Sequence, residues 1–299
     1  MSDIPEKLRP YVFHGVRFRA SKNNEVSASC PFCDREDGKF SVNQVTGQWR
    51  CFVCAEGTAK GGGNVYTFIR RMHEISAEHT DSHELTEFAH NRGLLDAVPM
   101  VEWGVCKSIL TGSWLIPGYN VQKHLTTLYQ YIKHSDGSMK LLPTPTLRHH
   151  MMGLGLWSDD KPVVYVCEGP WDGMALWECL CRGKNSPDGI VETASRASSL
   201  ASQANVFSIP GWGTFFESWL ALFSGRIVNI MLDSDHPRKN LKTGRVMTGG
   251  GWKGTERIVR MVCDKGIVPQ EVNVLTWGPE GFDPGRKSGY DLRDYVTSG

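Results

Sequence analysis

Two strand-like segments of the sequence end in carboxylates. The run Val163–Cys167 is followed by Glu168-Gly169 and then by a helical pattern. Further along, the apolar run Ile227–Leu232 leads into Asp233-Ser-Asp235, and alternation along an extended strand points both aspartates to the same side. Open α/β sheets bind ligands at the carboxyl ends of their strands. Carboxylates gathered there repel one another unless a hard cation neutralises them, and Mg²⁺ takes oxygen ligands of this kind. The alternative is two ordinary strand–helix turns with surface acids.

Four of the nine cysteines form two Cys-x-x-Cys pairs separated by 17 residues: Cys30, Cys33, Cys51 and Cys54. Four thiolates fill the tetrahedral coordination sphere of Zn²⁺, so the spacing predicts a structural zinc site rather than a catalytic one. A redox dithiol or a disulfide ladder is the alternative. The segments 39–43 and 48–53 alternate like the strands of a hairpin that turns at Thr46-Gly47. Because this ribbon is small, we expect metal binding to supply most of its folding free energy.

The composition is that of a globular chain. With 299 residues, 40% of them hydrophobic and 22% charged, the chain is long enough for one large domain or two modest ones. It has no apolar run of membrane-spanning length and no secretory pattern at its start. The other five cysteines are scattered, which predicts a reducing environment, and we expect a cytoplasmic protein without a membrane partner. Because the net charge is only +1, any nucleic-acid surface must be local.

On the ribbon, aromatic rings suited to base stacking alternate with cations suited to phosphates. They are Phe40, Trp49 and Phe52, with Lys39 and Arg50. Some of these rings must fill the thin core of the ribbon itself, so stacking and core packing are both open roles for them.

Two further basic stretches follow the ribbon. Lys133 and Lys140 flank one tight turn between the alternating segments 126–133 and 139–142, where they suit phosphate contacts; a solvated sheet face is the alternative. Beyond Asp235, the stretch 238–253 carries the cations Arg238, Lys239 and Lys253. We expect this stretch to bind nucleic acid or triphosphate rather than protein. A strand at 205–209 and helices starting near Thr214 and Gly254 complete the expected α/β pattern.

These motifs resemble those of DnaG-type primases of phages or plasmids. The Glu-Gly turn followed by Asp-x-Asp resembles the Toprim signature, which occurs in primases, topoisomerases, RecR and certain nucleases. The segment from Cys30 to about His79 resembles the zinc-binding domain of the primases, with Cys-Pro-Phe, a Phe-x-Val strand, Cys-Phe-x-Cys, glycines and a Phe-bearing helix in the same order. That family often has one histidine among the zinc ligands, whereas all four are cysteine here. The ending around Asp291 resembles the last motif of the family.

The resemblance implies a multi-domain α/β protein with a small zinc-ribbon β domain, a mixed α+β basic subdomain and a Toprim α/β sheet. We expect the ribbon domain at 1–79, an acidic connector at 80–91, the basic subdomain at 92–160 and the Toprim subdomain at 161–299.

The function implied by the resemblance is that of a DNA primase, which synthesises short RNA primers de novo on single-stranded DNA from ribonucleoside triphosphates during phage or plasmid replication. Catalytic Mg²⁺ or Mn²⁺ would be held by Glu168, Asp233, Asp235 and Asp291, with Asp172 and Asp294 as further candidates. Lys133 and Lys140 would hold the template and the initiating nucleotide, and the zinc ribbon would read a trigger sequence.

The resemblance also implies a helicase partner. The sequence has no phosphate-loop motif and ends soon after the last family motif, so we expect a replicative helicase in trans, contacted through the ribbon or the acidic stretch 78–87.

Two other functions share these motifs. A Toprim nuclease would use the same acids for hydrolysis, and a RecR-like zinc/Toprim module would bind DNA without needing intact catalytic acids. A topoisomerase needs a nucleophilic tyrosine on a further large domain, for which the sequence has no room.

Overall fold

The computed structural model describes residues 4–33, 39–54, 61–134, 137–182, 202–233, 238–239, 246–247 and 249–275. The chain divides into two compact units. Unit 1 comprises Met1–Leu85, Gly104–Gly118 and Leu125–His150, and unit 2 comprises Thr86–Trp103, Tyr119–His124 and Met151–Gly299. The expected segment 92–160 is shared between the two units, and the expected boundaries at 79, 91 and 160 stay predictions.

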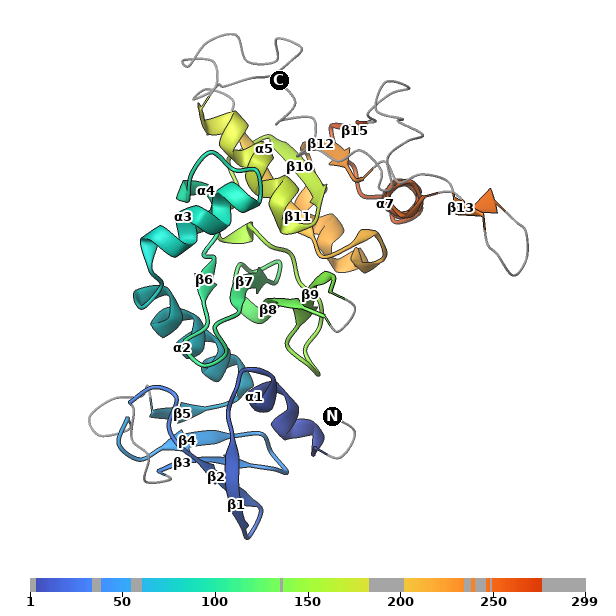
Figure 1. Ribbon diagram of the computed structural model, residues 1–299. Helices are drawn as coiled ribbons and strands as arrows, with labels where there is room; N and C mark the ends of the chain where they lie inside the picture. The colour runs from blue at the N-terminus through green and yellow to red at the C-terminus, as the bar shows by residue number, and fades with distance from the viewer. Residues whose placement is uncertain are drawn as a thin grey trace. The chain divides into compact units, whose positions relative to one another are not determined.

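Unit 1 begins with a short helical stretch, η1 (Glu6–Leu8) and α1 (Arg9–Phe13), and continues with an antiparallel sheet. Its strands lie in chain order, as Figure 1 shows: β1 (Phe18–Lys22), β2 (Glu25–Ala28), β3 (Phe40–Asn43), β4 (Trp49–Cys51) and β5 (Gly62–Gly63). The sequence predicted β3 and β4 but not the β1–β2 hairpin. The turn of this hairpin is Asn23-Asn24, and both residues have positive φ, as type I′ turns require. Two consecutive asparagines are therefore the sequence signal that could have indicated the hairpin.

The amphipathic helix α2 (Val65–Glu78) follows the ribbon. Asn64 caps it by accepting hydrogen bonds from the backbone N–H groups of Tyr66 and Thr67. A second antiparallel sheet then contains β6 (Cys106–Lys107), β7 (Trp114–Tyr119), β8 (Leu125–Lys133) and β9 (Met139–Pro143), in that order.

The ribbon, α2 and the second sheet share one hydrophobic core. Phe68 of α2 meets the rings of Tyr11 at 4.6 Å, Phe32 at 5.5 Å and Trp49 at 6.2 Å between centroids. Leu115 and Leu128 of the second sheet belong to the same buried cluster. The expectation that metal binding supplies most of the folding free energy of the ribbon is therefore revised, because its aromatic residues are buried in a larger core.

Unit 2 contains a four-stranded parallel sheet in the order β11-β10-β12-β15. The strands are β10 (Val163–Glu168), β11 (Ala204–Ile209), β12 (Ile227–Met231) and β15 (Glu271–Val274). Its described α-helices are α4 (Val98–Glu102), α5 (Pro170–Arg182), α7 (Gly250–Asp264) and the part of α3 (Ser82–Asn91) from Thr86 onward. The acidic stretch after residue 78 lies largely in α3. The predicted multi-domain α/β class is confirmed.

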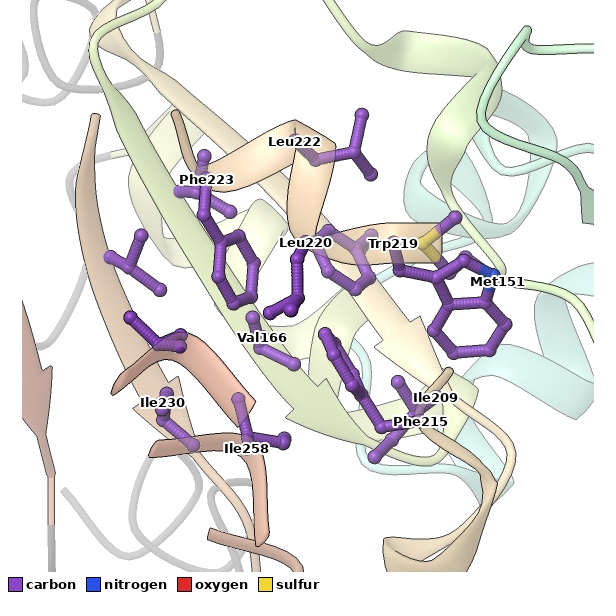
Figure 2. Packing of buried hydrophobic residues seen from close by; sticks show 14 of the residues in the cluster. Met151, Val166, Ile209, Phe215, Trp219, Leu220, Leu222, Phe223, Ile230 and Ile258 are labelled. Carbon is purple, nitrogen blue, oxygen red and sulfur yellow. The ribbon is translucent and has the colours of Figure 1, made fainter. Parts of the chain in front are cut away.

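One face of the parallel sheet packs on an aromatic cluster, shown in Figure 2. Val166, Ile209 and Ile230 lie on this face and meet Ile258 of α7 and Phe223 of η5 (Glu217–Phe223). The helix expected from Thr214 onward is instead two 3₁₀ segments, η4 (Trp212–Thr214) and η5. In η5 the buried pairs Trp219/Leu222 and Leu220/Phe223 recur every three residues, the period of a 3₁₀ helix.

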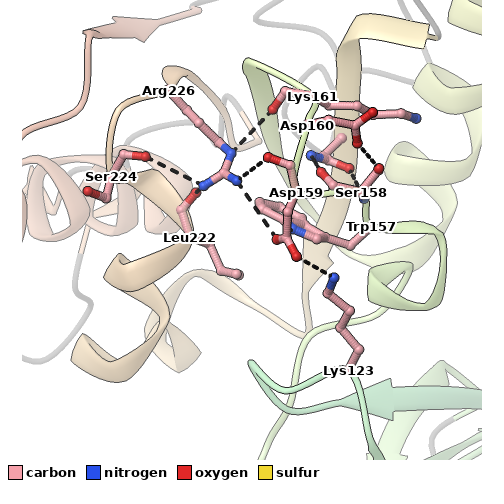
Figure 3. Close-up of polar contacts among 10 residues, drawn as sticks. Lys123, Trp157, Ser158, Asp159, Asp160, Lys161, Leu222, Ser224 and Arg226 are labelled. Atoms are coloured by element: carbon pink, nitrogen blue, oxygen red, sulfur yellow. Dashed lines mark hydrogen bonds and ion pairs between the residues drawn. The ribbon is translucent and has the colours of Figure 1, made fainter.

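Arg226 fixes the amino-terminal end of this sheet, as Figure 3 shows. Its guanidinium donates to the carbonyl oxygens of Asp159 at 2.8 Å, Lys161 at 3.2 Å and Leu222 at 3.3 Å. The backbone N–H of Ile227 donates to Pro162 at 2.9 Å, so β12 starts level with β10. Because β10 and β12 start level, their carboxyl ends also lie level with each other.

Smaller elements complete the described structure. They are η3 (Leu154–Leu156) and the antiparallel pair β13 (Arg238–Lys239) and β14 (Val246–Met247). Among the helices in the described ranges, none combines the length and apolar character needed to cross a membrane.

Candidate zinc centre and acidic sheet edge

The four cysteines predicted to bind zinc come together in unit 1. Their sulfur atoms all lie within 4.8 Å of one another, with Cys30 and Cys54 at 3.7 Å and Cys33 and Cys51 at 3.8 Å. Tetrahedral coordination with Zn–S bonds of about 2.3 Å requires sulfur–sulfur distances of about 3.8 Å. The geometry therefore fits one structural Zn²⁺, which confirms the predicted ligand set.

Burial makes this site depend on a cation. Desolvation raises the pKa of the Cys30 thiol well above its usual value and that of Cys54 to about 12. Without metal, the Cys30 and Cys54 thiols stay protonated at neutral pH. A divalent cation is what converts them into thiolates and holds the two knuckles together.

The ribbon sheet has a buried face and an open face. Val26, Val42 and Trp49 are register neighbours on the buried face, and Trp49 is 3% exposed. Its indole N–H donates to Thr67 Oγ1 at 2.9 Å and lies 3.1 Å from the Asn64 carbonyl oxygen. The Trp49 and Phe40 rings are thus core residues, and the predicted stacking role does not fit them.

The open face of the ribbon carries Arg50 between small neighbours. Ser41 and Gly62 are its register partners, and a groove of about 780 Å³ runs over them. Phe52 is 52% exposed and lies under the Arg50 guanidinium at 4.7 Å from the ring centroid. Lys39 is also exposed. This face offers a cation and an aromatic ring to a flat, anionic ligand.

In unit 2 the predicted acids lie at the carboxyl edge of the parallel sheet. Glu168 ends β10, and Asp233 lies two residues beyond the end of the adjacent strand β12. Burial raises the pKa of Cys167 well above its usual value, and the nearby Asp172 and Asp233 carboxylates raise it further. Both aspartates are thus close to the residue before Glu168, and the sheet brings three carboxylates to one edge.

The Glu168 carboxylate is oriented by the turn after β11. Its Oε1 accepts a hydrogen bond from the backbone N–H of Trp212 at 3.1 Å. The donor chemistry at this edge fits Mg²⁺. Within the described ranges, however, only the four cysteines bring three or more ligand atoms within 4.8 Å, so the described acids do not form a closed cage.

Helix α7 packs on the acidic edge through glycines. A Cβ at Gly251 would lie 2.0 Å from the carbonyl oxygen of Asp233, and a Cβ at Gly254 would lie 2.8 Å from Cβ of Trp212. Only glycine permits this approach, which fixes the backbone of Asp233 against the first turn of α7. The sequence did not single out these two glycines.

The two lysines proposed to act together lie in unit 1 on adjacent strands. In the β8–β9 ladder, Lys133 pairs with Met139 and Ile132 pairs with Lys140. Paired residues share a face and consecutive residues alternate, so Lys133 and Lys140 project from opposite faces of the hairpin. Lys133 is exposed and Lys140 is half-buried.

Several predicted site residues lie outside the described residues: Asp235, Asp291 and Asp294. Arg238 and Lys239 lie on β13, and Lys253 lies on the first turns of α7.

Comparison with known proteins locates a family in the N-terminal part. The model of the CHC2 zinc finger family matches residues 8–92, which contain the four cysteines. No curated protein matches the sequence.

Several solved structures are similar in fold. The zinc-binding and RNA polymerase domains of the Aquifex aeolicus primase match over 99% of this chain and 81% of that one, at 13% identity and a TM-score of 0.47. The primase fragment of the bacteriophage T7 primase-helicase matches over 92% and 89%, at 14% identity and a TM-score of 0.41. The DnaG catalytic core matches over 71% and 72%, at 12% identity and a TM-score of 0.47. Likenesses of this strength do not assign a function. The family match is confined to the zinc-binding segment, where residues 8–92 match the model of the CHC2 zinc finger.

Proposed function

We propose that this protein is a DNA primase that synthesises short RNA primers on single-stranded DNA. The observation that carries the proposal is the combination of two features in one chain. A CHC2 zinc finger with a complete four-cysteine site precedes a parallel sheet whose carboxyl edge gathers Glu168, Asp172 and Asp233. Polymerisation needs both a surface for the template and carboxylates for catalytic metal ions.

The acids would hold the metal ions that bind and orient the triphosphate end of the substrate. Glu168 and Asp233 would hold Mg²⁺ or Mn²⁺ together with Asp235 and Asp291. Such ions help to deprotonate the attacking 3′-hydroxyl and neutralise charge on the leaving pyrophosphate. The hydrogen bond from Trp212 N–H holds Glu168 Oε1, and Gly251 of α7 packs on the backbone of Asp233, so this chain presents both acids in fixed positions.

The template would lie on the open face of the ribbon. Arg50, Lys39 and the exposed Phe52 supply phosphate contacts and stacking there. Lys133 and Lys140 would make separate contacts, because they project from opposite faces, and Arg238, Lys239 and Lys253 would add further phosphate contacts. A replicative helicase acting in trans and a role in phage or plasmid replication complete the proposal.

The test is primer synthesis on defined single-stranded templates with labelled ribonucleotides and Mg²⁺. Asp233→Asn should abolish the products while single-strand affinity stays within about twofold, because removing an acid does not weaken phosphate contacts. The matched control is Asp264→Asn, at the exposed end of α7, which should leave synthesis unchanged.

The same reaction, run in parallel with a labelled template and with a strand-binding measurement, separates the alternatives. Shortened template without new RNA would identify a nuclease, and strand binding without any reaction would identify a binding module. Full synthesis by Asp233→Asn at saturating Mg²⁺ would show that this edge is not the catalytic site.

A further inference from the structure

The turn after β11 combines a fixed backbone with an exposed indole. Gly211 O accepts hydrogen bonds from Thr214 N at 2.9 Å and Thr214 Oγ1 at 2.7 Å. Arg257 of α7 donates to Gly213 O at 2.6 Å, and Trp212 N donates to Glu168 Oε1. The backbone of this turn is therefore held at four points.

The contacts that hold this turn involve the backbone of Trp212 and not its side chain. It is 42% exposed, although its Cβ sits against Gly254 of α7. Burying a tryptophan is strongly favourable, so an exposed indole on a fixed backbone beside a catalytic carboxylate has no evident packing role.

A second exposed indole follows the glycine that packs on Asp233. Trp252 of α7 is 54% exposed and follows Gly251, the residue that packs on the backbone of Asp233. Gly254, which packs on Trp212, is two residues further along the same helix. Two exposed indoles thus belong to residues whose backbone, or whose chain neighbour, touches an acid of this edge: Trp212 at Glu168 and Trp252 beside the glycine packed on Asp233.

We propose that Trp212 is a stacking platform for the base of the ribonucleoside triphosphate whose phosphates bind at Glu168 and Asp233. The proposal rests on the proposed function and names the part of the site that holds the base. Stacking on an indole suits every base, because each has a π-face, so this contact would position nucleotides without selecting among them. The fixed backbone means that little conformational entropy is lost when the base stacks.

Substituting the indole tests the platform without disturbing the acids. The hydrogen bond to Glu168 comes from the backbone N–H, so Trp212→Ala and Trp212→Phe both retain it. Trp212→Ala should raise the KM for ribonucleotides about tenfold with little change in kcat, and Trp212→Phe should recover most of the loss. The control is Phe216→Leu, an aromatic of the same segment whose ring packs edge-on against Trp219 at 5.1 Å; its KM should not change.

Direct binding separates this proposal from the proposed function. Calorimetric titration with Mg²⁺–ATP should show the same tenfold weakening in Trp212→Ala, whether or not primers are made. In parallel, a labelled oligodeoxynucleotide should bind Trp212→Ala and the parent equally, because the platform serves the triphosphate rather than the template.

Each contrary outcome overturns the platform. Equal ATP affinity in Trp212→Ala and the parent, or no ATP binding by the parent, would refute it. A loss confined to the oligodeoxynucleotide would assign the indole to the template instead. Intact stacking with no primer synthesis would refute the primase assignment alone.

Discussion

At the residue scale, close packing constrains positions that sequence patterns do not mark. The cysteines and acids were predicted because metal chemistry demands particular residue types at particular spacings. Gly251 and Gly254 were missed because a glycine in a helix carries no signal of what approaches it. For Trp49 two roles stayed open, because an aromatic residue on an alternating strand suits a core and a stacking surface equally, and only the fold decides which.

Gly251→Ala should destabilise unit 2 and reduce activity. Alanine in a helix interior is normally favoured over glycine by about 1 kcal/mol. Here the added Cβ would lie 2.0 Å from Asp233 O, so α7 must move away from the acidic edge and the effect changes sign. Urea unfolding and primer synthesis would measure both losses. Gly213→Ala, where a Cβ meets open space, is the control; a Gly251→Ala protein as stable as the parent would contradict this packing.

Buried His14 should make unit 1 sensitive to acid. Burial lowers its pKa from the usual value to about 3, while its ring contacts Thr144 Oγ1 at 2.9 Å and Gln130 Nε2 at 3.3 Å. Below pH 6.5 the unfolded chain binds a proton that the folded state refuses. The contribution of neutral His14 to the free energy of unfolding is therefore complete above pH 6.5 and is lost as the pH falls toward 3. At pH 5 the free energy of unfolding is lower by about 2 kcal/mol.

The measurement for this prediction is the urea midpoint of unit 1 at pH 7.5 and pH 5. His14→Gln should reduce the difference between the two urea midpoints, whereas His83→Gln, at an exposed position of the same unit, should not. An identical pH dependence in the parent and His14→Gln would show that this imidazole is not held neutral by burial.

At the element scale, strands with a strong alternating or apolar pattern could be predicted from the sequence, whereas the pairing register between strands could not. The strands β8, β9, β10 and β12 were all anticipated from their apolar patterns. The relative facing of Lys133 and Lys140 depends on which residues pair across the turn, and a shift of one residue reverses it. The β1–β2 hairpin was missed because its strands are short and polar, although Asn23-Asn24 is a turn signal.

Arg226→Gln should destabilise the parallel sheet by about 2 kcal/mol, because three carbonyl oxygens, two of them partly buried, lose a charged donor. The guanidinium joins the segment before β10 to the end of η5, and these contacts set where both strands begin. Arg260→Gln is the matched control, since its ion pair with Glu256 is exposed and such pairs contribute little. Equal unfolding midpoints for the two variants would refute the role of Arg226 as a clamp.

At the scale of the whole chain, the types of structural unit could be predicted from the sequence, but the way in which they share a core could not. The sequence indicated a zinc ribbon, a strand-rich middle and a parallel α/β sheet because each has its own periodicity and motif. It did not indicate that the ribbon and the second sheet share a core. That sharing depends on Phe68 and its neighbours on α2 meeting residues far away in the chain, which no local pattern encodes.

Loss of zinc should therefore weaken more of unit 1 than the ribbon. Cys51 is fully buried in the same cluster as Phe40, Phe68 and Leu128, so Cys51→Ser removes a metal ligand from inside a shared core. Native mass spectrometry should show that this variant has lost its zinc, and hydrogen exchange should show reduced protection in α2 and β8 as well as in β3 and β4. Cys263→Ser, at an exposed position, should change neither. Reduced protection confined to the ribbon strands would mean that the ribbon folds independently on its metal, and unchanged zinc content would refute the four-thiolate site.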